Sequence, residues 1–507
     1  MSSSKILKHY SLNRNPFTDR TAEKSNLTTE SYYIHSDLQG FEPNETTYLF
    51  FGKRGSGKTT IRMQMQRAYE QFNATALVSG LEKAHFIVDL CKPGHITSCL
   101  RAFQAHLACG EDSWDTHFSE NWLSADLVDC ILSYAATALV EKFRTVGPEA
   151  QAMTDALRLN DKCRKQFLLL AHLYANSDHN TLALIRQKLM PPRSTAASVA
   201  LGMTAVTSIG GAGYGLHALL ERGNPTVDKL AQQVNNMLPA VLKKPKVAAV
   251  AGVTAAGVLY AYTSRSKAKR SLARAQALLK PIHVVPHKDA ELIEGVVGAL
   301  FTRADTADAI RSQYLGNSGH QKLDLLQSLV QNLGYQSVAV FGDCFDEVTL
   351  LDPVVYPAAL KAFAREVCRN DILNFGRLHF FFPDSRIALD LNTDRVLKEA
   401  RFDRHFVRDL VWSRHQLEDL AERRFKACQA SGKGEVVDDL CPEFSELFAK
   451  VGAEDFHSSL AKLHTPRELL IMMTEMLSRI ESHNENDYTV APQDMEIAVQ
   501  KASEQTV

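Results

Sequence analysis

The sequence predicts an α/β fold: a mainly parallel sheet, interrupted by a large helical insertion and followed by a C-terminal helical domain. Three observations lead to this prediction. Short apolar runs have the composition of buried strands, and one of them continues through a glycine-rich loop into a helix. Asp343, the acid expected at the same sheet edge, lies 285 positions beyond Lys58 of that loop (343 − 58), more than one compact domain needs. Residues 401–507 show helical periodicity.

The composition is that of an ordinary globular protein with more than one domain. The chain has 507 residues, of which 45% are hydrophobic and 23% are charged. Lys and Arg total 57 against 58 for Asp and Glu, so the chain has no global basic field, and this weakens nucleic acid as an expected partner. The nine cysteines include no C-x-x-C pair, which argues against a disulfide framework and a structural zinc site.

The first strand leads into a loop with the shape of a phosphate-binding site. Residues 46–51 form a β-branched and aromatic run, residues 52–59 fit G-x-x-x-x-G-K-[ST], and a helix is expected over residues 59–70. The glycines let backbone N–H groups turn inward toward an anion at the helix N-terminus. Lys58 can reach the β- and γ-phosphates, and the Thr59 hydroxyl can bind Mg²⁺. The predicted nucleotide-binding residues of this loop are Gly52, Lys53, Arg54, Gly55, Ser56, Gly57, Lys58, Thr59 and Thr60.

The acid that completes a magnesium site is expected in the segment S-V-A-V-F-G-D-C-F-D-E-V, residues 337–348. Its apolar part reads as a strand, and Asp343 follows the carboxyl end, where open α/β sheets bind their ligands. Asp343 would hold Mg²⁺ together with Thr59, directly or through water. Asp346 or Glu347 would orient the attacking water as a general base. The alternative is that these acids only cap the next helix.

Two further strands fit the same sheet, at residues 86–90 and 378–382. The second is closed by P-D-S-R, and its Arg386 is the candidate for a contact with the γ-phosphate. An equally weighted alternative is a surface arginine that pairs with Asp384 or Asp390.

Together, the phosphate loop, the strand with D-x-x-D-E and the strand ending in S-R resemble the additional-strand P-loop ATPases. Within them, the sequence is most similar to the STAND and KAP group of signalling NTPases. The resemblance covers residues 46–91 and 320–390, and it implies ATP and Mg²⁺ as cofactors. Many relatives in the wider AAA+ group place Glu directly after the magnesium-binding Asp, where this chain has Cys344. The identity of the catalytic base is therefore open, as is rapid turnover.

The chain between the two motifs reads first as helices, over residues 110–190, and then as a candidate membrane hairpin. Residues 196–220 and 247–264 hold no charged side chain, and the first stretch is long enough to cross a bilayer. Basic residues flank both ends, as in a hairpin whose ends lie in the cytosol. The alternative is a soluble pair of Ala-rich helices. The resemblance favours the membrane reading, because KAP-type ATPases carry membrane helices between their two nucleotide motifs.

The C-terminal region contains a distinct helix start at H-T-P-R-E-L-L, residues 464–470. Thr465 is the expected N-cap, Pro466 fits the first helical position and Glu468 completes a capping box. Arg467 resembles the lid arginine with which AAA+ and STAND proteins reach the nucleotide. The alternative is an ordinary helix start.

These interpretations divide the chain into five parts, which are an N-terminal arm (1–45), the first part of an NTPase domain (46–190), a membrane hairpin (191–274), the second part of the NTPase domain (275–400) and a helical lid (401–507). The leading hypothesis is a membrane-associated, ATP-binding and ATP-hydrolysing switch protein, with its NTPase domain in the cytosol and lipid contacts through the hairpin. One alternative is a soluble, cytoplasmic, origin-recognition-like ATPase associated with DNA. Another is a nucleotide-stabilised scaffold without turnover. The sequence leaves the protein partner and the oligomeric state open.

Overall fold

The structure, a computed structural model, divides the chain into two compact units. The first unit holds residues 1–138, 283–286 and 317–507, and the second holds residues 139–282 and 287–316. Within them, the residues that the structure describes are 4–20, 38–79, 84–190, 272–273, 275–286, 290–300, 314, 318–390, 394–429, 442–483 and 487–505.

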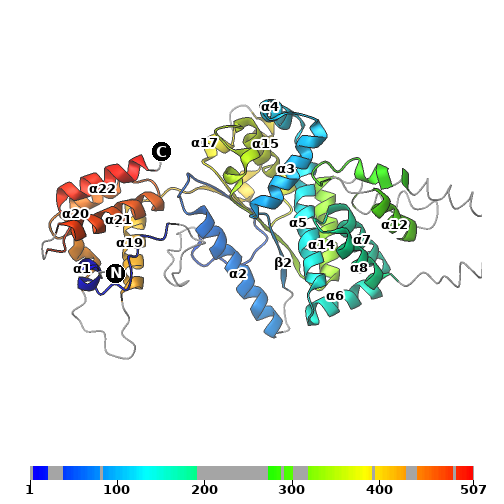
Figure 1. The fold of residues 1–507 in the computed structure, drawn as a ribbon, viewed down its shortest axis with the longest axis horizontal. Coiled ribbons are helices and arrows are strands. Elements are labelled where there is room, and N and C mark those ends of the chain that lie inside the picture. The colour runs from blue at the N-terminus through cyan, green and yellow to red at the C-terminus, as the bar shows by residue number, and fades with distance from the viewer. Residues whose placement is uncertain are drawn as a thin grey trace, which may run out of the picture. The chain divides into compact units, whose positions relative to one another are not determined.

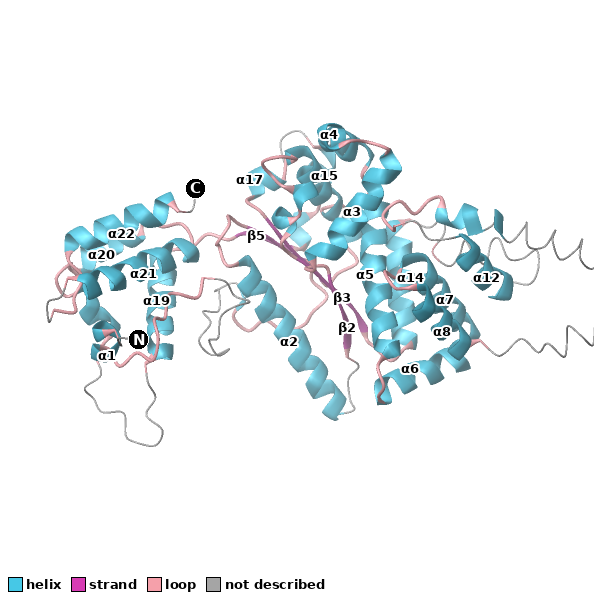
Figure 2. Ribbon diagram, in the orientation of Figure 1, coloured by secondary structure: helices cyan, strands magenta, loops and turns pink. Residues whose placement is uncertain are grey.

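A five-stranded sheet lies in the first unit. Its strand order is β2-β3-β4-β1-β5, and every pair of neighbouring strands is parallel. The strands are β1 (Tyr48–Phe51), β2 (His85–Asp89), β3 (Ser337–Gly342), β4 (Leu378–Phe382) and β5 (Phe406–Asp409). Because all five run in the same direction, their carboxyl ends meet at one edge of the sheet (Figure 2). The predicted α/β class with a mainly parallel sheet is therefore confirmed.

The central strands are buried on both faces, as is usual for a parallel sheet covered by helices. Every residue of β1, β3 and β4 is buried. Helix α2 (Lys58–Ser79) covers one face, where Ile61, Met65 and Tyr69 join the core formed by strand side chains such as Phe341 and Phe381. On the other side lie α3 (Pro93–Leu107), α14 (Gly319–Asn332) and α15 (Pro357–Val367), as Figure 1 shows. The aromatic runs that predicted strands thus supply the core between the sheet and its helices.

The remaining helices of this part follow the strands in chain order. After β2 and α3 come α4 (Glu111–Asn121) and α5 (Ser124–Arg144). Between β3 and β4, besides α15, lie η5 (Phe345–Glu347), η6 (Thr349–Leu351) and α16 (Asn370–Leu373). Between β4 and β5 lie α17 (Ser385–Ala388), α18 (Arg395–Glu399) and η7 (Phe402–Arg404).

The C-terminal helices share one apolar core with the N-terminal end of the chain. This part contains α1 (Lys5–His9), α19 (Arg414–Cys428), η8 (Phe444–Phe448), α20 (Ala453–Leu460), α21 (Pro466–Ser482) and α22 (Pro492–Glu504). Tyr10 and Phe17 belong to the same buried cluster as the apolar residues of α19 and α21. The Glu481 carboxylate of α21 accepts hydrogen bonds from the backbone N–H groups of Lys5 and Ile6. The first residues of the predicted N-terminal arm therefore pack against the C-terminal helices.

The prediction that residues 401–507 are helical is wrong at the start of that segment. Residues 406–409 form β5, which pairs with β1 at the edge of the sheet. Four residues are too few to show the alternation that identifies a strand, so the neighbouring helical pattern dominated the sequence interpretation. From Arg414 onward the described part of the segment is helical, as expected.

The described part of the second unit is also helical. It contains α6 (Pro148–Leu159), α7 (Asp161–Tyr174), α8 (His179–Leu189) and α12 (Ala290–Leu300). Helix α7 packs against the other three. Asn160 caps the start of α7 and Asp178 caps the start of α8, each by accepting a backbone N–H in the first turn. These helices agree with the helical reading of residues 110–190.

The predicted membrane hairpin, with its stretches 196–220 and 247–264, lies outside the described residues. Within the residues that the structure does describe, no single helix combines the length and the apolar character of a membrane span. Helices α4 and α5 reach that threshold only as a pair, across a bend of 104°.

Candidate functional site

The predicted phosphate loop connects β1 to α2, at the edge where the carboxyl ends of the strands meet. Gly55 and Gly57 have φ angles of +87° and +90°, in the left-handed region that glycine adopts without strain. The backbone N–H of Gly52 donates to the Phe382 carbonyl at 3.2 Å, which ties the loop to the end of β4. The Ser56 hydroxyl is buried and makes no hydrogen bond within the described structure. The loop therefore has the glycine conformations and an unused polar group that a phosphate site requires.

Lys58 lies at the first position of α2, with its side chain folded back over the loop. Its Nζ donates to the Gly52 carbonyl at 2.7 Å and approaches the Lys53 carbonyl at 3.4 Å. Lys58 is 8% exposed, so little water reaches the ammonium group. These carbonyls hold the positive charge at the loop, where an incoming phosphate would compete for it.

Asp343 follows β3 directly and is buried beside α2. Its Oδ1 accepts the Cys344 N–H at 2.8 Å, and its Oδ2 lies 3.4 Å from Nε of Arg62. Burial raises the pKa of Asp343, against the opposing effects of hydrogen bonds from Cys344 and Thr59 and of the Arg62 and Lys58 charges. The structure thus brings Asp343 close to Lys58 and Thr59, from which it is far removed in the sequence.

The backbone after Asp343 turns sharply. Cys344 has a φ angle of +62°, an uncommon conformation for a residue with a side chain. The η5 turn follows and carries Asp346, which is half-buried, and Glu347, which is exposed. A positive φ at this point directs the chain away from the strand and sets these two acids on a turn beyond Asp343.

Arg467 lies at the start of α21, with the predicted Thr465 cap and Pro466 at the first helical position. Its backbone N–H donates to the Gly55 carbonyl at 3.3 Å. Burial and the nearby Arg54 lower the pKa of Arg467, while Glu347 and Asp346 act in the opposite direction. The predicted lid arginine therefore contacts the phosphate loop and lies near both predicted acids.

Arg386 differs from the other predicted residues. Its side chain is 88% exposed, and Nε lies 3.5 Å from Oδ1 of Asp384. Asp384 also accepts the Arg386 N–H as the N-cap of α17. This arrangement matches the alternative of a surface pairing rather than a contact with the γ-phosphate.

Sequence reasoning missed three residues at this edge of the sheet. Arg62 lies on α2, one turn beyond Lys58, and faces Asp343. Asp89 ends β2 and contributes to the electrostatic surroundings of Arg62. Trp412, which we expected on a helix, lies in the loop after β5 and donates its Nε1–H to the Ser56 carbonyl at 2.8 Å. Asp89 could have been found as an acid at a strand end, whereas the other two depend on tertiary contacts.

The residues present suit a magnesium ion bound with a nucleotide. Mg²⁺ prefers oxygen ligands and usually takes one or two from the protein, with phosphates and water supplying the others. The Thr59 hydroxyl and the Asp343 carboxylate provide such oxygens, and Oδ2 of Asp343 is buried with no hydrogen-bond partner in the described residues. Among the described residues, no group of three or more His, Cys, Asp or Glu side chains is placed to hold a metal ion.

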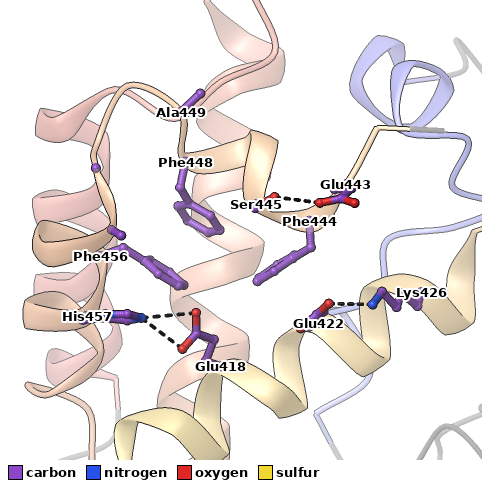
Figure 3. A pocket seen from close by; sticks show the side chains of 12 residues that line it. Glu418, Glu422, Lys426, Glu443, Phe444, Ser445, Phe448, Ala449, Phe456 and His457 are labelled. Carbon is purple, nitrogen blue, oxygen red and sulfur yellow. Dashed lines mark hydrogen bonds and ion pairs between the residues drawn. The ribbon is translucent and has the colours of Figure 1, made fainter. Parts of the chain in front are cut away.

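A separate cavity of about 530 Å³ lies among the C-terminal helices (Figure 3). Phenylalanine rings line one side of it, and its acids are largely paired. Glu418 lies 3.1 Å from His457, and Glu422 lies 2.6 Å from Lys426. None of the residues predicted from the sequence lines this cavity. The candidate site is therefore the sheet edge around the phosphate loop.

Comparison of the chain with protein-family models, with curated proteins and with solved structures finds no match. The functional argument rests on the geometry of the sheet edge.

Proposed function

We propose that this chain is a P-loop NTPase that binds ATP with Mg²⁺ and hydrolyses it as a switch. The observation that carries the proposal is the meeting of Lys58, Thr59 and Asp343 at one sheet edge, although 285 positions separate the first from the last (343 − 58). The strand order adds support, because β4 stands as an additional strand between β1 and β3. This order is in keeping with the resemblance to the additional-strand ATPases.

In the proposed mechanism, the loop N–H groups around Gly55 and Gly57 bind the phosphates. Lys58 exchanges its bond with the Gly52 carbonyl for one with the β- or γ-phosphate, which is favoured because a charged acceptor binds an ammonium more strongly than a carbonyl does. Thr59 and Asp343 would hold the metal, which would supply positive charge to offset that of the phosphates. Asp346 or Glu347 orients the attacking water.

The link between the nucleotide and the rest of the protein would run through two contacts with the loop. The Arg467 N–H donates to Gly55, and the Trp412 indole donates to Ser56. A phosphate that rearranges the loop must disturb both bonds, which connect it to the C-terminal helices. We infer that ATP binding changes the position of these helices, as in other switch proteins.

The proposal includes membrane association through residues 196–220 and 247–264, with the NTPase part in the cytosol. Recovery of the full-length chain in the soluble fraction without detergent would argue against this association.

The alternative to hydrolysis is a nucleotide-stabilised scaffold without turnover, favoured by Cys344 at the position after Asp343 and by the exposure of Glu347. Unchanged behaviour of the Asp346→Asn and Glu347→Gln variants would support this scaffold.

The decisive experiment is the titration of ATP into the Lys58→Ala variant by calorimetry, in the presence of Mg²⁺. We expect a loss of affinity of about 100-fold or more, because the variant lacks the ammonium group that the loop holds against the Gly52 carbonyl. Lys462→Ala, which removes an exposed lysine of the C-terminal helices, is the matched control and should bind as the wild type does. Unchanged affinity of Lys58→Ala would remove the site assignment.

A further inference from the structure

The magnesium-binding acid of the proposed site already faces a resident positive charge. Nε of Arg62 lies 3.4 Å from Oδ2 of Asp343, and the two side chains are 10% and 1% exposed. An ion pair this well shielded from water interacts far more strongly than a surface pair. Arg62 also lies one turn of α2 beyond Lys58 and Thr59, inside the region where the metal would bind.

The surroundings of Arg62 place its charge between two strand ends. Burial lowers the pKa of Arg62, while Asp343 and Asp89, which ends the neighbouring β2, are among the groups that raise it, and the net shift is upward. Among the described residues, Nη1 of Arg62 also donates a hydrogen bond to Oε1 of Gln66, at 2.9 Å. Strands β2 and β3 pair in register from His85 to Asp89, so the two acids lie at the same end of adjacent strands. The Arg62 guanidinium thus pairs with Asp343 and is also influenced by the charge of Asp89.

A carboxylate in this position poses a problem for nucleotide binding. A triphosphate carries several negative charges, and it must approach a buried carboxylate across a medium that screens charge poorly. In the general scheme, a metal held by the acid would supply the positive charge that offsets this repulsion. In this chain, Arg62 opposes the same repulsion before any metal arrives.

We propose that Arg62 takes over part of the charge-neutralising role of the metal, so that this chain binds nucleoside triphosphates with little dependence on divalent cations. The inference rests on the proposed function, since it concerns the same site. It assigns to Arg62 a positioning and specificity role: it compensates Asp343 and contacts no reacting atom. Metal remains necessary for hydrolysis, because Arg62 lies against the acid and the transferring phosphoryl group still requires charge stabilisation.

The test measures ATP affinity of the full-length chain by calorimetry, once with Mg²⁺ and once with EDTA. For the wild type we expect the two dissociation constants to agree within about fivefold. For Arg62→Gln, which keeps a polar side chain but removes the charge, we expect the EDTA value to rise by about tenfold or more. The Mg²⁺ value should change by less than about threefold, because the metal replaces the missing charge.

Two further variants separate the charge effect from a folding effect. In the double variant Arg62→Gln/Asp343→Asn, the repelling carboxylate is gone, so binding in EDTA should return to within about threefold of the wild type. Arg62→Lys keeps the positive charge. The ratio of its ATP dissociation constants in EDTA and in Mg²⁺ should therefore stay near that of the wild type. Thermal unfolding of each variant without ligand shows whether it is folded. If Arg62→Gln is unfolded, the ratio of the two dissociation constants of Arg62→Lys is used in its place.

The outcomes distinguish the inference from the proposed function. Wild-type binding that requires Mg²⁺ would overturn the inference and leave the nucleotide site intact. Equal binding of Arg62→Gln with and without metal would likewise overturn the inference alone. A wild type that binds no ATP under either condition would overturn both proposals.

Discussion

Two neighbouring strands of the same sheet, β3 and β4, end at the same edge and present their polar residues in opposite ways. Asp343 after β3 has a side chain that is 1% exposed and that faces Arg62. Arg386 after β4 has a side chain that is 88% exposed and pairs with the adjacent Asp384. The sequence predicted a role at the nucleotide for both residues. The comparison shows that a position beyond a strand end brings a residue near a site without deciding which way its side chain points.

The local backbone explains the difference. Asp343 is the first residue after Gly342, so it continues the direction of the strand before the positive φ of Cys344 turns the chain away. Arg386 lies four residues beyond Phe382, inside α17, where Asp384 caps the helix by accepting its N–H. Within this short helix, Arg386 lies on the face toward solvent, whereas Ala388 lies on the buried face.

The Asp343→Ala substitution tests the buried side of this comparison, and we expect the largest effect from it. Removal of one partner from a buried ion pair leaves the other charge without compensation, and this typically costs about 3 kcal/mol or more of unfolding free energy. Urea denaturation of the variant, followed by the fluorescence of the chain, measures the loss. A loss below about 1 kcal/mol would mean that water reaches Arg62 or that Asp89 compensates it fully.

A second test addresses the buried contact between β3 and β4. His379 of β4 is fully buried beside Phe341 of β3, and burial lowers its pKa to about 3. An unfolded histidine binds a proton below about pH 6.5 and the folded one does not, so stability is retained at neutral pH and falls as the pH drops from about 6.5 toward 3. The loss for this one group should reach about 2 kcal/mol at pH 5.

The variant His379→Phe keeps the aromatic packing and removes the titrating ring. Its stability should therefore change less between pH 7.5 and pH 5 than that of the wild type, by about the same 2 kcal/mol. Urea unfolding at the two pH values provides the measurement. Equal pH dependence of the two proteins would show that His379 takes up its proton in the folded state.

The smallest effect is expected for Arg386→Ala. An exposed side chain with one adjacent partner contributes little, so the unfolding free energy should change by no more than about 0.5 kcal/mol. The same variant also tests whether Arg386 takes part in ATP hydrolysis. A decrease of ATP turnover by more than about tenfold would show that Arg386 swings toward the γ-phosphate when nucleotide binds, in spite of its exposed position here.

Much of the candidate site could be predicted because its signals are local. The glycines of the loop, Lys58 and Thr59 occupy eight consecutive positions, and the helix start with Thr465, Pro466 and Arg467 is equally compact. Such patterns report backbone conformations that neighbouring residues fix among themselves. Strand β5 was missed for the opposite reason, since four residues reveal it only through their pairing with β1.

The sequence by itself determined the class of the sheet, the position of the glycine-rich loop between β1 and α2, and the strand end that Asp343 follows. This was possible because the types of neighbouring residues and their order indicate which segments are buried and where the chain turns. Only the tertiary structure decided that Arg62 faces Asp343, that Trp412 and Arg467 bind the loop, and that Arg386 points to solvent. These outcomes depend on how a side chain is directed after the elements have packed, and residues far apart in the chain set that direction together.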